Sequence, residues 1–381
     1  QTAGECHAKS NLDWVCGLSD WNYYQGDGNP NHKSQTFDPF CKQTFMTSFH
    51  NHSSLTLVLF STHNNERSTR GYRGSINIVY APPGFEQPLP MIFETLWHYK
   101  KEFPENKANL SFTSNLNDLY NQDILLIALP SHSIKKILNN FQINNKTIVV
   151  NCSKGFDVKT QKTLSSMVIN ELNINPNQFV ALSGPSHAEE VLNKIPTAIV
   201  AASVSIKNAQ IIQKEFSNNY FRIYTTTDLI GVEIGGACKN IISIAAGICI
   251  GLKYGDNTIA ALISRGLQEI IRFGSKYNAN KNTFYGLSGL GDLTVTAFSK
   301  HSRNREFGIK IGEGLTLKDA EKEIKMTIEG ISATKIIYNL SKKDKINMPI
   351  VNQVYSILFD NKNPKIAINE LMKRKLVFEK D

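Results

Sequence analysis

A lysine and an asparagine, Lys239 and Asn240, lie within a long run of isoleucine, alanine and glycine between Asp228 and Gly251. Apolar residues recur in this run at helical spacing, so we predict a buried helix. An ammonium group inside such a helix costs free energy unless it is paired or used in chemistry. Small residues at 235–237 would allow a ligand or another backbone to approach closely. The alternative is a structural lysine whose side chain extends its ammonium to water.

Polar residues follow three of the predicted strands. Ser153-Lys154-Gly155 comes after the strand expected at 147–150, and SGPSHAEE at 183–190 comes after the strand expected at 179–182. A third polar group, at 225–228, follows the last expected strand. Ligands of parallel sheets gather beyond the carboxyl ends of the strands, and a helix opened by 183–190 would offer free N–H groups to an anion. We therefore expect a ligand site here; the alternative for each group is a polar loop that caps a helix.

The second half of the chain carries two further polar clusters. Residues 286–292 (GLSGLGD) combine three glycines with the carboxylate of Asp292, and Thr296 follows shortly after. Residues 301–305 (HSRNR) place a serine, an asparagine and two arginines at the start of a predicted helix, which is typical of a phosphate site. The alternative for 301–305 is a capped helix start exposed to solvent. Together with Lys239, these clusters provide an amine, a carboxylate and a binding site for an anion, but these groups alone do not identify a reaction.

The hydrophobic pattern predicts an α/β half followed by an all-α half. Short apolar strands alternate with helical segments, which indicates a mostly parallel sheet covered on both faces. Strands are expected at 110–113, 124–129, 147–150, 179–182, 198–202 and 221–224, with a helix at 133–141. Helices then continue at 228–251, 256–277, 305–313, 316–325, 329–343, 349–360 and 364–374. We expect an atypical segment at 1–90, a nucleotide-binding domain at 91–227 and a helical substrate domain at 228–381.

Residues 1–90 differ in composition from the rest of the chain. Two strand-like runs, 54–61 and 75–80, flank a turn-rich segment, and over about 30 residues this resembles the closing hairpin of an extracellular β-sandwich module such as a CUB domain. A glycosylation sequon at Asn51 and three early cysteines, Cys6, Cys16 and Cys41, agree with that resemblance. The alternative function is therefore an extracellular binding module in residues 1–90. Because the chain opens at Gln1 without a methionine or an apolar leader, we expect a fragment, a processed product or an engineered chain.

Composition limits the classes of partner. Hydrophobic residues make up 41% and charged residues 20% of the 381, an ordinary globular balance. The formal charge of +9 comes from scattered lysines, so we expect small anionic substrates rather than nucleic acid. No uninterrupted apolar run is long enough to span a bilayer, so no integral membrane segment is expected. No cysteine pair has C-x-x-C spacing, so we expect no metal site, and the isolated Cys152, Cys238 and Cys249 favour a reduced, cytoplasmic location.

Six motifs then occur in the order of one enzyme family. They are SKGF at 153–156, SGPSHAEE at 183–190, GACKN at 236–240, GLSGLGDLTVTA at 286–297, SRNREFG at 302–308 and TIEG at 327–330. Over about residues 96–375 the chain resembles bacterial-type NAD(P)-dependent glycerol-3-phosphate dehydrogenase. The resemblance implies a Rossmann-like sheet domain followed by a helical domain. It also implies NADP or NAD as cofactor, a role in glycerophospholipid synthesis, a cytoplasmic location and a homodimer.

The resemblance also implies roles for particular residues. Lys239 would be the general acid/base that gives a proton to the carbonyl oxygen of dihydroxyacetone phosphate, or takes one from sn-glycerol 3-phosphate. This needs a lowered lysine pKa, which burial and a nearby cation can provide. The implied catalytic residues are Lys239, Lys154, Asp292 and Thr296. The implied substrate-binding residues are Lys154, Gly184, Ser186, Lys239, Asn240, Asp292, Ser302, Arg303 and Asn304. The implied cofactor-binding residues are Lys154, Ala188, Arg303 and Glu329.

The chain departs from the family pattern at its start. The family begins with a strand and a G-x-G-x-x-G loop, and no such loop is present. The nearest substitute, residues 76–85, places Pro82 and Pro83 where backbone donors are needed, and proline has no N–H. We therefore expect that unrelated sequence replaces the first βαβ unit. Two alternatives follow, a catalytically impaired homologue and a dehydrogenase of similar architecture that acts on hydroxy acids; the phosphate cluster at 302–304 disfavours the second.

Overall fold

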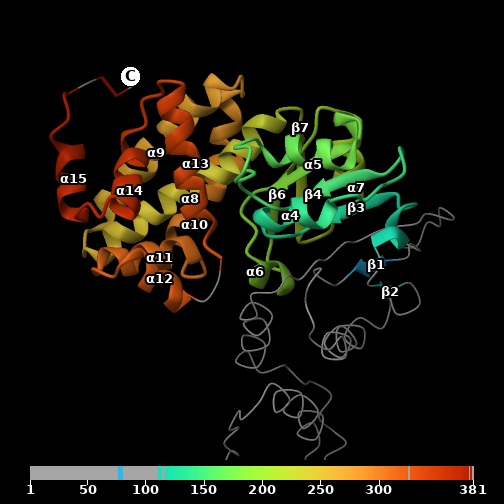
Figure 1. Ribbon diagram of the computed structural model, residues 1–381, viewed down its shortest axis with the longest axis horizontal. Coiled ribbons are helices and arrows are strands. Elements are labelled where there is room, and N and C mark those ends of the chain that lie inside the picture. The colour runs from blue at the N-terminus through green and yellow to red at the C-terminus, as the bar shows by residue number, and fades with distance from the viewer. Residues whose placement is uncertain (1–75, 80–109, 114–115, 325–326, 377, 380–381) are drawn as a thin grey trace, which may run out of the picture. The chain divides into compact units, whose positions relative to one another are not determined.

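The computed structural model describes residues 76–79, 110–113, 116–324, 327–376 and 378–379 (Figure 1). The expectations for the early cysteines, the sequon, the strand at 54–61 and the missing glycine-rich loop lie outside these residues. Within them, β1 (Ile76–Val79) pairs in parallel with β2 (Leu110–Thr113). The strand predicted at 110–113 is confirmed. The run at 75–80 is also a strand, but its partner in the described residues is a parallel strand rather than the antiparallel partner that a hairpin requires.

A second sheet contains five strands in the order β3-β4-β5-β6-β7. They are β3 (Ile124–Ile127), β4 (Ile148–Asn151), β5 (Phe179–Ser183), β6 (Thr197–Ala202) and β7 (Phe221–Thr226). All five match predicted strands. The pairs β3–β4, β4–β5 and β6–β7 are parallel, as expected, whereas β5 and β6 are antiparallel, with Leu182 opposite Ala201. The sheet is therefore mixed. The connection at 184–196 contains the short helix α6 (Ala188–Leu192) and returns the chain in the opposite direction.

Helices cover both faces of this sheet, as the apolar strands predict. Side chains at alternate strand positions, such as Leu125 and Ile127, pack with α4 (Ser131–Leu138), α5 (Leu164–Leu172) and the first turn of α8 (Leu229–Gly251). The intervening side chains, such as Leu126 and Val180, pack with α7 (Ile206–Phe216) on the other face. Because side chains alternate along a strand, two separate cores form, one on each face.

The remaining helices pack on α8, either directly or, for α12 and α15, through α11 and α14 (Figure 1). They are α9 (Asp256–Lys276), α10 (Asp292–Phe298), α11 (Arg303–Gly312), α12 (Leu317–Ile324), α13 (Glu329–Lys343), α14 (Pro349–Phe359) and α15 (Pro364–Met372). By length and composition α8 could cross a membrane, but 89% of its most apolar window is buried inside the protein. Its hydrophobicity is therefore accounted for by its place in the core. The structure confirms the eight predicted helices, with α4 at the helix expected at 133–141, and adds α5, α7 and α10.

Two glycines bring α11 against α8. A Cβ atom built on Gly247 would lie 2.1 Å from the Arg305 carbonyl oxygen, and one on Gly308 would lie 2.1 Å from the Ile244 carbonyl oxygen. Only residues without a side chain allow two helix backbones to approach this closely. The crossing fixes the start of α11, where the predicted phosphate cluster lies, beside the middle of α8.

Candidate active site

One buried carboxylate binds two lysines in this protein. Asp292 accepts from Lys239 Nζ through Oδ1 and from Lys154 Nζ through Oδ2, each at 2.5 Å. The exposed fractions of these side chains are 2% for Asp292, 9% for Lys239 and 19% for Lys154. The ammonium of Lys239 is therefore buried and paired, and it does not reach water as a structural lysine at a helix end would.

Three separate elements bring these groups together. Lys239 lies in the middle of α8, Lys154 follows β4, and Asp292 begins α10 directly after the π-helical turn η5 (Leu287–Gly291). Thr296 accepts a hydrogen bond from Lys239 Nζ at 2.7 Å and donates to the Asp292 carbonyl at 2.6 Å. Lys154 Nζ also donates to the carbonyl of Gly184, the residue after β5, at 3.2 Å. The contact joins the loops that follow β4 and β5, where parallel sheets carry their ligands.

The ionisation of these groups is shifted by burial and by their neighbours. Burial and the nearby charge of Lys154 together lower the pKa of Lys239 to about 8, and Asp292 opposes the shift. Burial disfavours ionisation of Asp292, but the two ammonium groups outweigh it and hold its pKa below the usual range. Lys239 can therefore gain or lose a proton near neutral pH while Asp292 stays ionised.

Ser243 links this group to the start of α11. Its hydroxyl donates to the Thr296 carbonyl at 2.8 Å and lies 3.2 Å from the Ser302 hydroxyl oxygen. Ser302 is the N-cap of α11 and accepts from the Arg305 N–H at 3.2 Å. Ser243 was not among the residues predicted for the site, although it lies one helical turn after Lys239, the i to i+4 spacing that places both on one face of α8.

Two asparagines connect α8, α11 and α13. Asn304 donates to the Asn240 side-chain oxygen at 3.1 Å and accepts from the Gly330 N–H at 2.9 Å. A side chain at Gly330 would collide with Asn304 at 2.6 Å, so this glycine makes room for the contact. These hydrogen bonds hold both amide groups beside the start of α11, where the phosphate site is expected.

Arg303 and Glu329 lie beside the same region. Arg303 is exposed and donates to the Thr327 carbonyl at 3.3 Å. Glu329 begins α13; burial raises its pKa, and the charges of Arg303, Lys154 and Lys239 oppose that shift. An exposed guanidinium next to a helix N-terminus can reach an anionic ligand.

Ser186 and Ala188 lie at the edge of this hydrogen-bonded group. Both are exposed, and the Ser186 hydroxyl donates to the Gly184 carbonyl at 3.2 Å. Between them in the chain, the ring of His187 lies next to that of His301, with centroids 5.9 Å apart and the ring planes tilted by 55°. This pair brings the loop after β5 next to the residues that precede Ser302. The structure therefore places two of the predicted residues at the edge of the site rather than in its centre.

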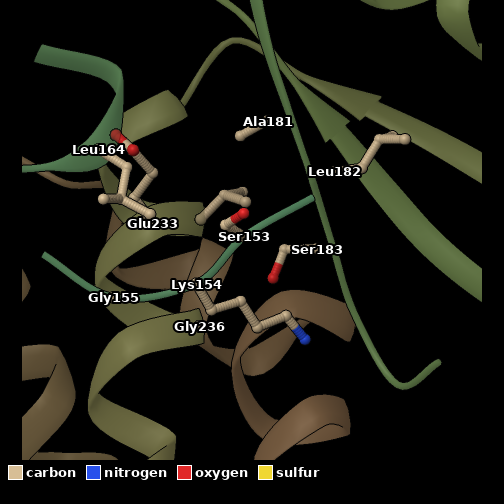
Figure 2. Close-up of a pocket in the computed structure, with 10 residues that line it drawn as sticks. Ser153, Lys154, Gly155, Leu164, Ala181, Leu182, Ser183, Glu233 and Gly236 are labelled. Carbon is tan, nitrogen blue, oxygen red and sulfur yellow. The ribbon is translucent and has the colours of Figure 1, made fainter. Parts of the chain in front are cut away.

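A small cavity lies beside Lys154, with about 250 Å³ of empty space including its open side (Figure 2). Figure 2 shows the Ser183 hydroxyl directed toward Lys154, whereas the carboxylate of Glu233 points away from it, next to Leu164. The Ser183 hydroxyl is buried and has no hydrogen-bond partner among the described residues. Ser183 opens the polar motif at 183–190, where the sequence predicts a ligand site, but it was not given a role of its own there.

The described residues fit one end of a nicotinamide cofactor. Gly155 and Gly184 follow β4 and β5 with φ of 124° and 150°, so these two buried positions have a backbone conformation in which a side chain would be strained. Lys154 and the exposed Ala188 lie at the same edge of the sheet. Among these residues no group of three or more metal-ligating side chains occurs. The loop that would hold the cofactor pyrophosphate falls outside the described residues.

Family models match two long segments of the chain. The model described as NAD-dependent glycerol-3-phosphate dehydrogenase N-terminus matches residues 98–209, and the corresponding C-terminus model matches residues 228–369. A relative named glycerol-3-phosphate dehydrogenase [NAD(P)+] from Clostridium botulinum is 48% identical over 256 residues, covering 67% of this chain and 77% of that protein. One of the same name from Fusobacterium nucleatum is 44% identical over 299 residues, covering 74% and 89%.

Two solved structures of proteins named glycerol-3-phosphate dehydrogenase are also similar to this chain. The glycerol-3-phosphate dehydrogenase of Coxiella burnetii matches with a TM-score of 0.66 and 36% identity, covering 70% of this chain and 82% of that chain. The Plasmodium falciparum glycerol-3-phosphate dehydrogenase matches with a TM-score of 0.66 and 26% identity, covering 71% and 78%. Together with the family models, these likenesses show that the chain belongs to the NAD-dependent glycerol-3-phosphate dehydrogenase family.

Proposed function

We propose that the chain interconverts dihydroxyacetone phosphate and sn-glycerol 3-phosphate with NADH or NADPH. The observation that carries this function is the buried Lys239–Asp292–Lys154 group, joined through Ser243 to the start of α11. It combines a lysine whose pKa lies near neutrality with an anion site at a helix N-terminus. The relatives named above support the substrate and cofactor, and the reaction would supply glycerol phosphate for glycerophospholipids.

Lys239 is the proposed general acid/base. In the reducing direction its ammonium gives a proton to the carbonyl oxygen of the substrate, and in the oxidising direction its neutral amine takes the hydroxyl proton. A general acid/base works best when its pKa lies near the working pH, and the pKa of about 8 meets this condition. Asp292 and Thr296 hold the amine in one direction because both contact Nζ.

Lys154 is the proposed second cation and a ligand of both substrate and cofactor. Its ammonium is held by Asp292 and by the Gly184 carbonyl, so it is oriented before substrate binds. A positive charge there lowers the pKa of Lys239 and stabilises negative charge that develops on the substrate oxygen. Gly184 and Ser186 would contact the substrate from the same loop.

Residues at the start of α11 are the proposed phosphate ligands. Ser302, Arg303 and Asn304 combine a hydroxyl, a guanidinium and an amide with the N–H groups of the first helical turn. A phosphate dianion at this end also interacts favourably with the helix dipole. Asn240 completes the group because its amide binds that of Asn304. This arrangement favours a phosphorylated substrate over an unphosphorylated hydroxy acid.

The proposed cofactor contacts are Lys154, Ala188, Arg303 and Glu329. When bound, NADH or NADPH supplies the hydride. Glu329 begins α13 beside the charges of Lys154 and Lys239, where it can accept a hydrogen bond from the carboxamide end of the cofactor.

The proposal extends to the organisation of the protein. We divide it into an N-terminal segment at 1–90, a nucleotide-binding domain at 91–227 and a helical catalytic domain at 228–381. We further propose a homodimer in the cytoplasm. The dimer is supported because a two-fold dimer is the commonest form of a soluble oligomer. The cytoplasmic location is supported by the free thiols of Cys152, Cys238 and Cys249.

The test begins with binding of NADH and NADPH to the purified chain, measured by fluorescence titration. Loss of nicotinamide absorbance after addition of dihydroxyacetone phosphate then measures turnover. Lys239→Ala should abolish turnover and keep cofactor binding, whereas Lys276→Ala, at the exposed end of α9, should change neither. Binding without turnover in the unmodified chain would indicate an impaired homologue. Failure of a folded chain to bind either cofactor would contradict the proposal.

A further inference from the structure

At Gly235, α8 approaches the backbone of η5. A Cβ atom on Gly235 would lie 2.7 Å from the Ser288 carbonyl oxygen, 3.4 Å from the Ser288 carbonyl carbon and 3.5 Å from Gly289 Cα. These are backbone atoms of a buried turn, so they cannot rotate away as the end of a flexible side chain can. Any side chain at position 235 would therefore push α8 and the turn apart.

This contact lies next to the pair of groups proposed to move the proton. Gly235 precedes Lys239 by one turn of α8, so both lie on the same face of that helix. Ser288 lies in η5, and the chain leads from it directly into Asp292. The two segments thus meet first backbone to backbone, at Gly235 and Ser288, and then side chain to side chain, at Lys239 and Asp292.

We propose that Gly235 is a positioning residue, whose lack of a side chain sets the distance from α8 to residues 288–292 and so brings the Asp292 carboxylate to Lys239. The inference rests on the proposed function, because it assumes that Lys239 is the general acid/base. Gly235 touches neither substrate nor cofactor in this account and acts through the spacing of two segments.

A merely structural role for Gly235 would change stability without changing the ionisation of Lys239. A positioning role changes both, because Asp292 raises the pKa of Lys239 against the effects of burial and Lys154. Moving the carboxylate away removes that opposing effect. The pKa of Lys239 should then fall below its value of about 8.

The principal experiment compares Gly235→Ala with the unmodified chain in the oxidation of sn-glycerol 3-phosphate. That direction requires the neutral amine, so kcat should rise with pH through the pKa of Lys239. In Gly235→Ala we expect this midpoint to move down by about 0.5 pH units or more and the maximal kcat to fall by about tenfold. The control is Gly255→Ala, since no atom lies within 4 Å of the added methyl group, and its midpoint should not move.

A second variant with a smaller steric clash tests the inference if Gly235→Ala does not fold. In Gly286→Ala the added methyl group would lie 3.3 Å from the Thr283 carbonyl oxygen and displace the start of the same turn slightly. Its midpoint should move in the same direction by a smaller amount. Unchanged midpoints in both variants, when folded, would overturn the positioning role.

A second readout separates this inference from the proposed function. The pH titration of the Lys239 Nζ signal, in protein labelled with ¹⁵N-lysine and assigned with Lys239→Arg, requires no turnover. A downward shift of this titration in Gly235→Ala supports positioning even if the chain proves inactive, in which case only the proposed function fails. Normal turnover with an unshifted titration would retain the function and reject the role of Gly235.

Discussion

Asp292 lies 2.5 Å from Lys239, although the two residues are 53 positions apart in the chain. The same carboxylate holds Lys154 at 2.5 Å through its other oxygen. One anion cannot neutralise two cations, so the buried group carries a net positive charge when both lysines are protonated. Burial of that excess charge explains why Lys239 gives up its proton more easily than an ordinary lysine.

Replacing Asp292 by asparagine should remove the only carboxylate in direct contact with the two ammonium groups among the described residues. Without it, burial and Lys154 act unopposed, so the pKa of Lys239 should fall further and both lysines should lose their orientation. We expect kcat to fall by about 10² or more in both directions. Steady-state kinetics with saturating cofactor measure the effect. Asp360→Asn, on the exposed end of α14, is the matched control, and equal losses in the two variants would contradict a specific role for Asp292.

The two reaction directions should respond to pH with opposite sign. Reduction needs protonated Lys239, so its kcat should fall as the pH rises through about 8; oxidation needs the neutral amine, so its kcat should rise over the same interval. Rates measured in both directions between pH 6 and pH 10 test this prediction. Parallel profiles would show that another group controls the proton transfer.

Two substitutions of Asn304 should separate its effect on phosphate binding from its effect on stability. Asn304→Asp keeps an acceptor for the Gly330 N–H but places a negative charge beside the phosphate, so we expect KM to rise by about tenfold or more, equivalent to ~1.4 kcal/mol. Asn304→Ala removes both hydrogen bonds and should lower stability as well as affinity. Melting temperatures and KM values measure the two effects, with Asn369→Ala on exposed α15 as control. A larger loss of affinity in the alanine variant would count against electrostatic exclusion.

Local sequence patterns were sufficient for most of the fold but not for the contacts of the site. The apolar run gave the bounds of α8 almost to the residue, because nearly all of that helix is buried. The antiparallel β5–β6 pair was missed because both strands are apolar on both faces, and such runs carry no information on direction. Helix α10 was missed because it follows three glycines and contains Thr294, Val295 and Thr296, which favour helices weakly. Its bonds to α8 through Lys239 and Ser243 compensate for that weak preference.

The same distinction applies to the candidate site. Single motifs identified the amine, the carboxylate and the anion cluster because each is polar in an apolar context. Their mutual distances depend on contacts between residues far apart in the chain, such as Lys154 with Asp292 across 138 positions, and no local pattern encodes them. Ser243 could have been found from its spacing to Lys239, whereas Gly235 gains meaning only when the turn at 287–291 is seen against it.

Glu233 should make the stability of the protein depend on pH. Burial raises the pKa of this carboxyl from 4.5 to about 7, even though Ser165 donates to it from its N–H at 2.7 Å and its hydroxyl at 2.5 Å. The folded state therefore favours the protonated acid. The free energy of unfolding that protonated Glu233 contributes is fully present below pH 4.5. It is lost as the pH rises toward 7, by on the order of 3 kcal/mol at most.

Glu233→Gln removes the carboxyl group that becomes charged, so the free energy of unfolding of this variant relative to the unmodified chain should increase between pH 4.5 and 7. Urea unfolding at several pH values measures this difference, with Glu306→Gln, at an exposed position of α11, as control. A difference that stays constant over this range would show that Glu233 does not titrate between the folded and unfolded states.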